Sequence, residues 1–168
     1  MNGQKSPSQL GCEWAEECIE MCTARSVYVE EQGVRATFTN SQRKPVRKIH
    51  YDDCYYSGRG ERADYIVGLA GGIDVIVELK GTDANLKDAA RQVEKTLDNW
   101  KEHHMRAGSI AALIIYGRIE GRKKLPGRAP RTEAVISGLR AEFLKGRRTV
   151  LLIHENGRKR FSFRDFSF

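Results

Sequence analysis

The chain has 168 residues, 40% of them hydrophobic and 30% charged, which fits one folded domain and excludes general disorder. It contains no apolar run near the roughly 20 residues of a membrane helix and starts without the apolar core of a signal peptide, so we expect a cytoplasmic protein. The formal net charge of +7 favours a polyanionic partner, most often nucleic acid, although basic side chains also serve solubility alone.

The first part of the chain predicts a helix followed by a series of strands. Residues 1–8 are polar and are expected to be flexible, and residues 9–168 are expected to form a single domain. From about Gln9 to Ala24, apolar residues recur with helical spacing opposite a row of glutamates. A basic turn is expected around Pro45 and a hairpin turn at Gly71-Gly72. Strands are predicted at Ser26–Glu31, Val34–Phe38, Ile49–Tyr56, Ala63–Leu69 and Ile73–Gly81.

The four cysteines lack the spacing of a zinc site. Cys18 and Cys22 lie one helical turn apart in the apolar pattern, and no second close pair follows them. We therefore expect half-buried structural thiols in a reducing compartment rather than metal ligands.

The second part of the chain predicts helices that alternate with buried strands. Helical spacing runs from about Asp83, as the N-cap, to His104, and a second helix is expected from about Thr132 to Lys145. Between the helices lie an aliphatic strand and then a loop of glycine, proline and basic residues, Gly121–Arg131. The remaining strands are predicted at Ser109–Ile119, Thr149–Ile153 and Phe161–Phe168. This order predicts an α/β protein with a mixed β-sheet that is flanked by helices and covered on both faces.

The segment Ile73–Gly81 combines a core-forming strand with acidic and basic side chains. Because side chains alternate along a strand, its aliphatic residues fill one face, while Asp74, Glu78 and Lys80 share the other with Ile76. Charges on such a strand are costly when buried and unpaired. This cost favours a metal-binding or catalytic role over a solvated face with cross-strand ion pairs, so we expect the active site here.

Asp64, at the head of the preceding strand, makes a divalent-metal site plausible. A hairpin brings an acid from each strand toward one ion, and Mg²⁺ prefers carboxylate and water oxygens. Such an ion polarises a phosphoryl group and lowers the pKa of its bound water. Lys80 projects to the same face as Glu78, about 6–7 Å along the strand. It would orient or help deprotonate the water, or neutralise charge on the phosphate.

This pattern resembles a known family. Asp64, followed after a hairpin by Glu78-Leu79-Lys80, resembles the PD-(D/E)xK nuclease signature of the restriction-endonuclease-like fold. The segment Gln92–Thr96 is similar to the glutamine motif on the next helix, although it ends in threonine rather than an aromatic residue. The order of the expected elements also fits that core across most of the chain. The resemblance implies that Asp64 and Glu78 bind Mg²⁺ (or Mn²⁺), that Lys80 assists the attacking water, and that Gln92 positions the lysine, water or phosphate.

Two further positions for a metal ligand stay open. Members of the family often carry an additional glutamate on the first helix, and by resemblance Glu16 or Glu17 is the candidate, with a solvated helix face as the alternative. Asp74 is an extra acid, which either shares the metal site or is a spectator too far along the strand.

Basic residues gather in segments that suit phosphate contacts, which position nucleic acid without reading its sequence. No zinc finger or helix-turn-helix is evident, and the alternative is scattered solubilising charge. The expected contacts are Arg43, Lys44, Arg47, Lys48, Arg122, Lys123, Lys124, Arg128 and Arg131, with Arg158-Lys159-Arg160 as a further segment.

The sequence therefore predicts a metal-dependent endonuclease that hydrolyses phosphodiester bonds in DNA, and a homodimer would allow so small a domain to cut two strands. The first alternative is a catalytically inactive nuclease-like module that binds nucleic acid or protein, but the intact acidic and lysine residues argue against it. A basic RNA-binding protein of the ribosomal kind would leave the charged strand face unexplained. A docking peptide at Phe161–Phe168 is the third alternative, although its alternation suits an edge strand better.

Overall fold

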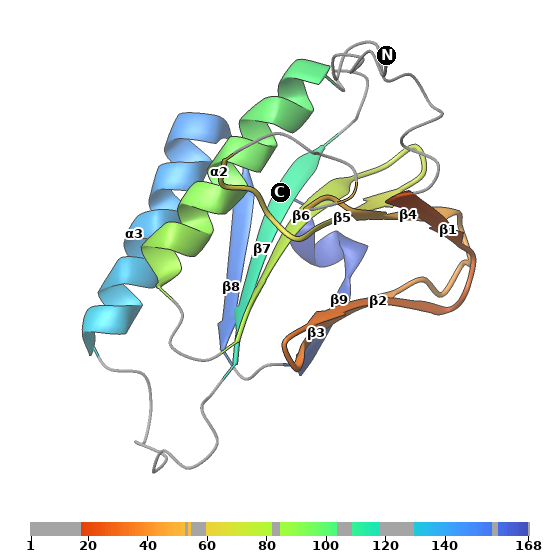
Figure 1. Ribbon diagram of the computed structural model, residues 1–168, viewed down its shortest axis with the longest axis horizontal. Helices are drawn as coiled ribbons and strands as arrows, with labels where there is room; N and C mark the ends of the chain where they lie inside the picture. Colours follow the sequence, from red (N-terminus) through yellow and green to blue (C-terminus); the bar gives the residue numbers. More distant parts are fainter. Residues whose placement is uncertain are drawn as a thin grey trace, which may run out of the picture.

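The computed structural model describes residues 18–52, 54, 60–81, 85–103, 109–117, 130–155 and 158–167. Within these residues a six-stranded mixed sheet lies between two long helices and a three-stranded sheet (Figure 1), which confirms the α/β class. No helix in this part of the chain is long and apolar enough to cross a membrane.

The six-stranded sheet has the strand order β1-β4-β5-β6-β7-β8. The first four of these strands pair antiparallel, whereas β6, β7 and β8 pair parallel. Parallel neighbours need crossover connections, and helices α2 (Leu86–His103) and α3 (Pro130–Arg147) lie in these connections. The strands are β1 (Ile19–Cys22), β4 (Val46–His50), β5 (Tyr65–Leu69), β6 (Asp74–Lys80), β7 (Ile110–Tyr116) and β8 (Val150–Glu155).

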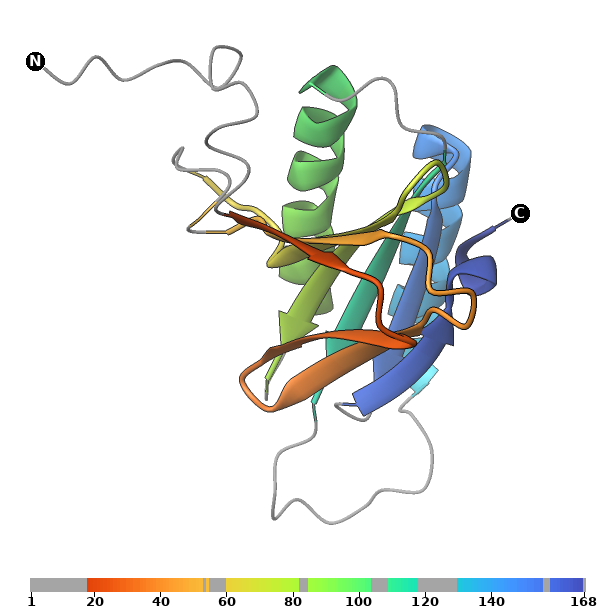
Figure 2. The same ribbon diagram turned by 90° about the vertical axis from the view of Figure 1, so that its right-hand side faces the viewer.

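The three-stranded sheet combines two early strands, β2 and β3, with the late strand β9. Strands β2 (Ser26–Glu31) and β3 (Val34–Thr39) form a hairpin, and β9 (Arg158–Ser162) pairs parallel with β3 before the short 3₁₀ helix η1 (Phe163–Phe166). Figure 2 shows β9 beside β3. The predicted strand over Phe161–Phe168 is therefore right only at its start.

The two faces of the large sheet bury separate apolar clusters. One cluster joins α2 and α3 to residues such as Ile76 and Ile114, and the other joins the small sheet to Val75, Val77 and their neighbours. Within the described residues, both helices cover one face and the small sheet covers the other. The sheet is thus mixed, flanked by helices and covered on both faces, as expected, and the second cover is a sheet. The inward residues of β2 and β3 are apolar, which makes the small sheet as effective a cover as a helix.

The N-terminal elements differ most from the predictions. Residues Ile19–Cys22 form β1 rather than the end of a helix, because each residue from Ile19 to Cys22 pairs with β4. The expected strand over residues 49–56 begins earlier, at Val46, and ends at His50. Residues 1–17 lie outside the described part, so the rest of the predicted helix is not addressed.

A disulfide joins Cys18 to Cys54, with their Cα atoms 5.6 Å apart. The prediction of unpaired thiols is therefore wrong for these two residues and right for Cys22. The cysteines belong to a strand edge and a turn that meet only when the sheet forms, so sequence spacing does not reveal the pair. A cross-link over 36 residues stabilises the fold mainly by restricting the unfolded chain.

Candidate functional site

Asp64 and Glu78 meet where β5 begins and β6 ends. The antiparallel register pairs Tyr65 with Val77, so its extension by one residue places Asp64 opposite Glu78. The Leu79 amide donates a 2.7 Å hydrogen bond to Oδ2 of Asp64. The Ala63 amide donates a 2.8 Å hydrogen bond to Oγ1 of Thr96 on α2. Backbone contacts therefore fix the two acids side by side.

The Glu78 carboxylate is fully buried and poorly satisfied. Its side chain is 0% exposed, and the Lys80 Nζ atom lies 2.6 Å from its Oε1 as an ion pair. Apart from this ion pair, the Asp64 backbone amide is the one donor among the described residues that favours the charged carboxylate, and neither oxygen makes a well-formed hydrogen bond. Buried carboxylate oxygens are normally saturated by donors or by a cation. The Glu78 carboxylate can therefore accept a further hydrogen bond or bind a cation.

The electrostatics of the acid pair oppose a double negative charge. Burial, followed by the neighbouring Glu78, raises the pKa of Asp64 to about 8. Burial also raises the pKa of Glu78 to about 7, although the Lys80 ammonium counteracts it. Burial is the largest single influence on the pKa of Lys80 and lowers it, but the negative charges of Glu78, Asp64 and Glu31 together leave this pKa raised. At neutral pH Lys80 is therefore a protonated ammonium, Asp64 is mostly protonated, and Glu78 is partly protonated.

Glu31 is a third acid near this pair that the sequence analysis does not single out. It is the last residue of β2, and it follows Val27 and Val29 on the inward face of the small sheet. Its negative charge adds to the burial that raises the pKa of Asp64 and Glu78. The signal in the sequence is the alternation itself, because a carboxylate continues an otherwise buried face of the strand.

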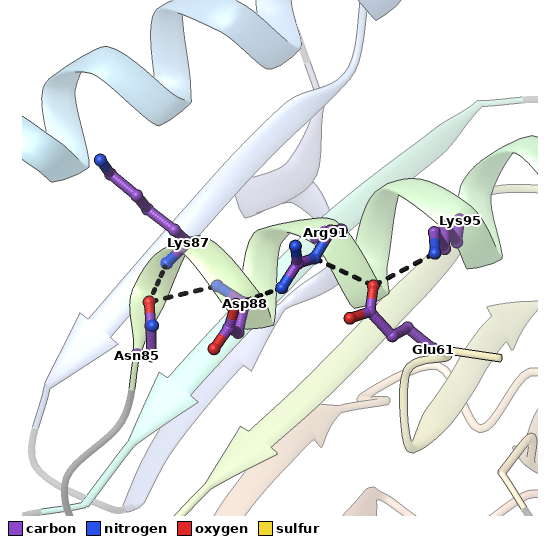
Figure 3. A network of polar contacts seen from close by, with 6 residues as sticks. All are labelled: Glu61, Asn85, Lys87, Asp88, Arg91 and Lys95. Atoms are coloured by element: carbon purple, nitrogen blue, oxygen red, sulfur yellow. Dashed lines mark hydrogen bonds and ion pairs between the residues drawn. The ribbon is translucent and has the colours of Figure 1, made fainter.

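Helix α2 covers the same end of the sheet. Gln92 lies one turn before Thr96, and its Oε1 atom is buried without a hydrogen-bond partner among the described residues. Arg91 and Lys95 on this helix converge on the Glu61 carboxylate, at 3.0 and 3.2 Å (Figure 3). These ion pairs hold the helix against the segment that leads to Asp64.

The start of α2 also differs from the prediction. Asn85 caps the helix, because its Oδ1 accepts hydrogen bonds from the amides of Lys87 and Asp88 at 3.1 and 3.3 Å (Figure 3). The expected N-cap, Asp83, lies outside the described residues.

Asp74 lies at the other end of β6 and is not brought to Asp64 and Glu78. Its Oδ1 accepts from Arg47 Nη2 at 3.1 Å, and its Oδ2 accepts from Trp100 Nε1 at 3.0 Å. Four residues along a strand separate it from Glu78 by roughly 13 Å. Gly68 makes room for it, since a Cβ there would lie 2.1 Å from Asp74 Oδ1. These contacts favour a structural role over metal binding.

Of the basic residues expected to contact phosphate, those whose side chains the structure describes do not converge on the acid pair. Arg43 and Lys44 are exposed in a turn at the far end of β5, where the Ala70 amide bonds the Pro45 carbonyl at 3.0 Å. Arg47 forms an ion pair with Asp74, and the Nζ atom of Lys48 lies 2.8 Å from Oε2 of Glu20. The remaining residues expected to contact phosphate lie outside the described residues, and they are Arg122, Lys123, Lys124 and Arg128. Arg131 belongs to α3, but its side chain is not described. The possible metal ligands Glu16 and Glu17 also lie outside the described residues.

The donor set of the pair suits a hard divalent cation. Two carboxylates offer the oxygen ligands that Mg²⁺ and Mn²⁺ prefer, and Oε2 of Glu78 has no hydrogen-bond partner among the described residues. Among the described residues, no three histidine, cysteine, aspartate or glutamate side chains are grouped closely enough to hold one ion. Water, backbone or substrate oxygens would therefore complete the coordination shell.

No protein-family model, curated protein or solved structure matches the chain.

Proposed function

We propose that this protein is a divalent-metal-dependent nuclease that hydrolyses phosphodiester bonds in DNA. One observation carries the proposal: the fully buried, unsatisfied Glu78 carboxylate lies opposite Asp64 and within 2.6 Å of the Lys80 ammonium. Structural carboxylates rarely keep both a like-charged neighbour and unsatisfied oxygens, whereas metal-binding carboxylates do so before the ion binds.

A cation resolves the electrostatic conflict within the pair. Burial raises the pKa values of Asp64 and Glu78 to about 8 and about 7, and the charge of Glu78 adds to this effect at Asp64, so both carboxyl groups resist ionisation. Asp64 and Glu78 would hold Mg²⁺ or Mn²⁺, which lowers the pKa of bound water and neutralises charge on a phosphoryl group. Cation binding at the pair would also release the protons that the acids retain.

Lys80 enters this site as an ammonium. Its raised pKa disfavours a role as proton acceptor while it is paired with Glu78. It can donate a hydrogen bond to the attacking water or to a phosphate oxygen, and so stabilise negative charge that develops in the transition state. Gln92, on α2, would position the same groups.

Phosphodiesters are the favoured substrate class for two reasons. The net charge of +7 suits a polyanion, and Asp64 with Glu78-Leu79-Lys80 resembles the PD-(D/E)xK signature. The succession of β4, β5, β6, α2, β7, α3 and β8 supports the finer proposal of a restriction-endonuclease-like core. This assignment remains an analogy in fold, and the site carries the functional proposal.

The test is cleavage of plasmid, linear and single-stranded DNA and of RNA, with Mg²⁺, Mn²⁺ or EDTA. Asp64→Asn, Glu78→Gln and Lys80→Met should each lower the metal-dependent rate by roughly 10²–10⁴-fold. Glu102→Gln, an equal change at an exposed position on α2, should leave the rate unaltered.

The outcomes discriminate between the candidate functions. Equal cleavage by the wild type and the site variants would reject the nuclease proposal, and cleavage of RNA alone would change the substrate. Binding of nucleic acid without cleavage under every condition would favour the alternative, an inactive nuclease-like binding module.

A further inference from the structure

We infer that the outer face of the three-stranded sheet binds single-stranded DNA, with arginines on the phosphates and Tyr28 against a base. This surface is separate from the acid pair, because Asp64 and Glu78 share the helix-covered face of the large sheet with Ile76. The choice of DNA over RNA rests on the proposed function, whereas the surface itself is argued from the small sheet alone.

Side-chain alternation along the three strands defines this outer face. Val29, Ala36 and Phe161, one from each strand, are buried between the two sheets, so their neighbours in sequence point outward. Figure 1 shows both long helices on the other side of the large sheet, and neither covers the outward residues. The strand register aligns these residues in three rows, Glu30–Arg35–Arg158, Tyr28–Thr37–Arg160 and Ser26–Thr39–Ser162.

The outer face carries more positive than negative charge. Glu30 is the one acid in the three rows, and it is ion-paired with Arg35. Arg158 lies opposite Arg35 on the neighbouring strand, and like charges in such positions repel. Arg158 and Arg160 are exposed, and neither is ion-paired within the described residues. A ligand with repeated phosphates would relieve the repulsion and neutralise both arginines.

A hydrogen bond holds one of these arginines across the face. Nη1 of Arg160, on β9, donates to Oγ of Ser26, on β2, at 2.8 Å, so this side chain spans the central strand β3. A guanidinium has five N–H donors in a planar fork, and those not used by Ser26 can bind a phosphate. The hydroxyls of Thr37 and Thr39 share this face and can donate to further phosphate oxygens.

Tyr28 places an exposed aromatic ring in the middle row. It is 50% exposed, and the guanidinium carbon of Arg35 lies 4.4 Å from the ring centre. Nζ of Lys48 lies 5.7 Å from the same point. Aromatic rings beside cations are typical of surfaces that stack unpaired bases and bind their phosphates without reading sequence. A duplex has its base faces stacked inside, so the ring favours a single strand.

The experiment measures binding of a fluorescein-labelled oligothymidylate of about 16 nucleotides to the full chain by fluorescence anisotropy. EDTA is present, so that metal-dependent cleavage does not intervene. Tyr28→Ala should weaken binding about tenfold, whereas Tyr28→Phe, which keeps the ring, should bind like the wild type. Thermal unfolding should be alike for the three proteins, because Tyr28 lies outside the core.

The salt dependence of binding tests the arginines. A variant with both Arg158→Gln and Arg160→Gln should lower the slope of log affinity against log salt by about 1.4, since each phosphate contact on a single strand contributes about 0.7. The matched control carries Lys145→Gln and Arg148→Gln, which remove two exposed positive charges at the end of α3, and its slope should equal that of the wild type.

The outcomes separate this inference from the nuclease proposal. Wild-type binding by Tyr28→Ala and by the arginine variant, or an equal loss in the control, would overturn the inference and leave the nuclease proposal standing. Tighter binding of duplex DNA or of RNA would also overturn it, as would displacement by polyglutamate, which would assign the face to an acidic protein. Binding that depends on Tyr28 and both arginines, in a chain that cleaves no substrate, would uphold the inference and reject the nuclease.

Discussion

The two ends of β6 carry buried carboxylates on the same face of one strand, but with opposite surroundings. Asp74 is 2% exposed, and both of its oxygens accept hydrogen bonds, from Arg47 and Trp100. Glu78 is 0% exposed and lies opposite Asp64 on the neighbouring strand, and its one ion pair within the described part of the chain is with Lys80. Burial alone therefore does not distinguish the structural acid from the candidate metal ligand.

The difference lies in what each carboxylate would gain from a ligand. Asp74 already has a cation and a neutral donor, so another cation would compete with existing partners. The pair at Glu78 has two acids for one ammonium, and a divalent cation would relieve that imbalance. Unsatisfied acceptors with raised pKa values are thus the feature that marks the candidate site.

The largest expected effect on stability is at the Asp74 end. Asp74→Ala leaves the buried Trp100 Nε1–H without an acceptor and Arg47 without its partner, so we expect the free energy of unfolding to fall by roughly 2–4 kcal/mol. Urea unfolding measures this change. Asp98→Ala is the matched control, because Asp98 also pairs with an arginine, Arg147, but is 59% exposed. A loss there as large as at Asp74 would contradict the structural role of the buried network.

At the Glu78 end of β6, removing a carboxylate is expected to raise the free energy of unfolding, and by less than the loss expected at Asp74. The folded pKa values of Asp64 and Glu78, about 8 and about 7, exceed their ordinary values of 3.8 and 4.5. The folded chain then binds more protons than the unfolded chain, so the contribution of the pair to stability falls as pH rises between about 4 and 8.

Asp64→Asn removes this penalty and keeps an acceptor for the Leu79 amide. Without metal, it should raise the free energy of unfolding at about pH 8 by on the order of 1–2 kcal/mol and leave it unaltered near pH 4. Unfolding of the wild type and the variant across this pH range measures the effect. A variant that is less stable than the wild type at every pH would show that the two carboxylates do not oppose each other.

Local pattern predicts the elements that bury a regular face. The alternation in Ile73–Gly81 predicts β6, and the spacing around Leu97 predicts α2. Residues Ile19–Cys22 are an exception, because their few apolar residues fit either a helical or a strand period and pairing with β4 decides the outcome. The small sheet is likewise hidden, since β9 reaches β3 from the opposite end of the chain.

The site was predictable in its acids and lysine but not in their surroundings. Asp64, Glu78 and Lys80 follow from one hairpin, whose geometry is local. The role of Asp74 depends on Arg47 and Trp100, which are 27 and 26 residues away in sequence. Glu31 required knowledge of which sheet β2 joins and which of its faces is buried, and these depend on tertiary packing.

Locating Mn²⁺ by anomalous X-ray scattering, in crystals grown at about pH 8 where the acids can ionise, tests the site most directly. The contrast between the two ends of β6 predicts an anomalous peak between the carboxylates of Asp64 and Glu78, and none at Asp74. A crystal with no peak at the Asp64–Glu78 pair, or with manganese bound at Asp74 instead, would contradict the assignment of this pair as the metal site.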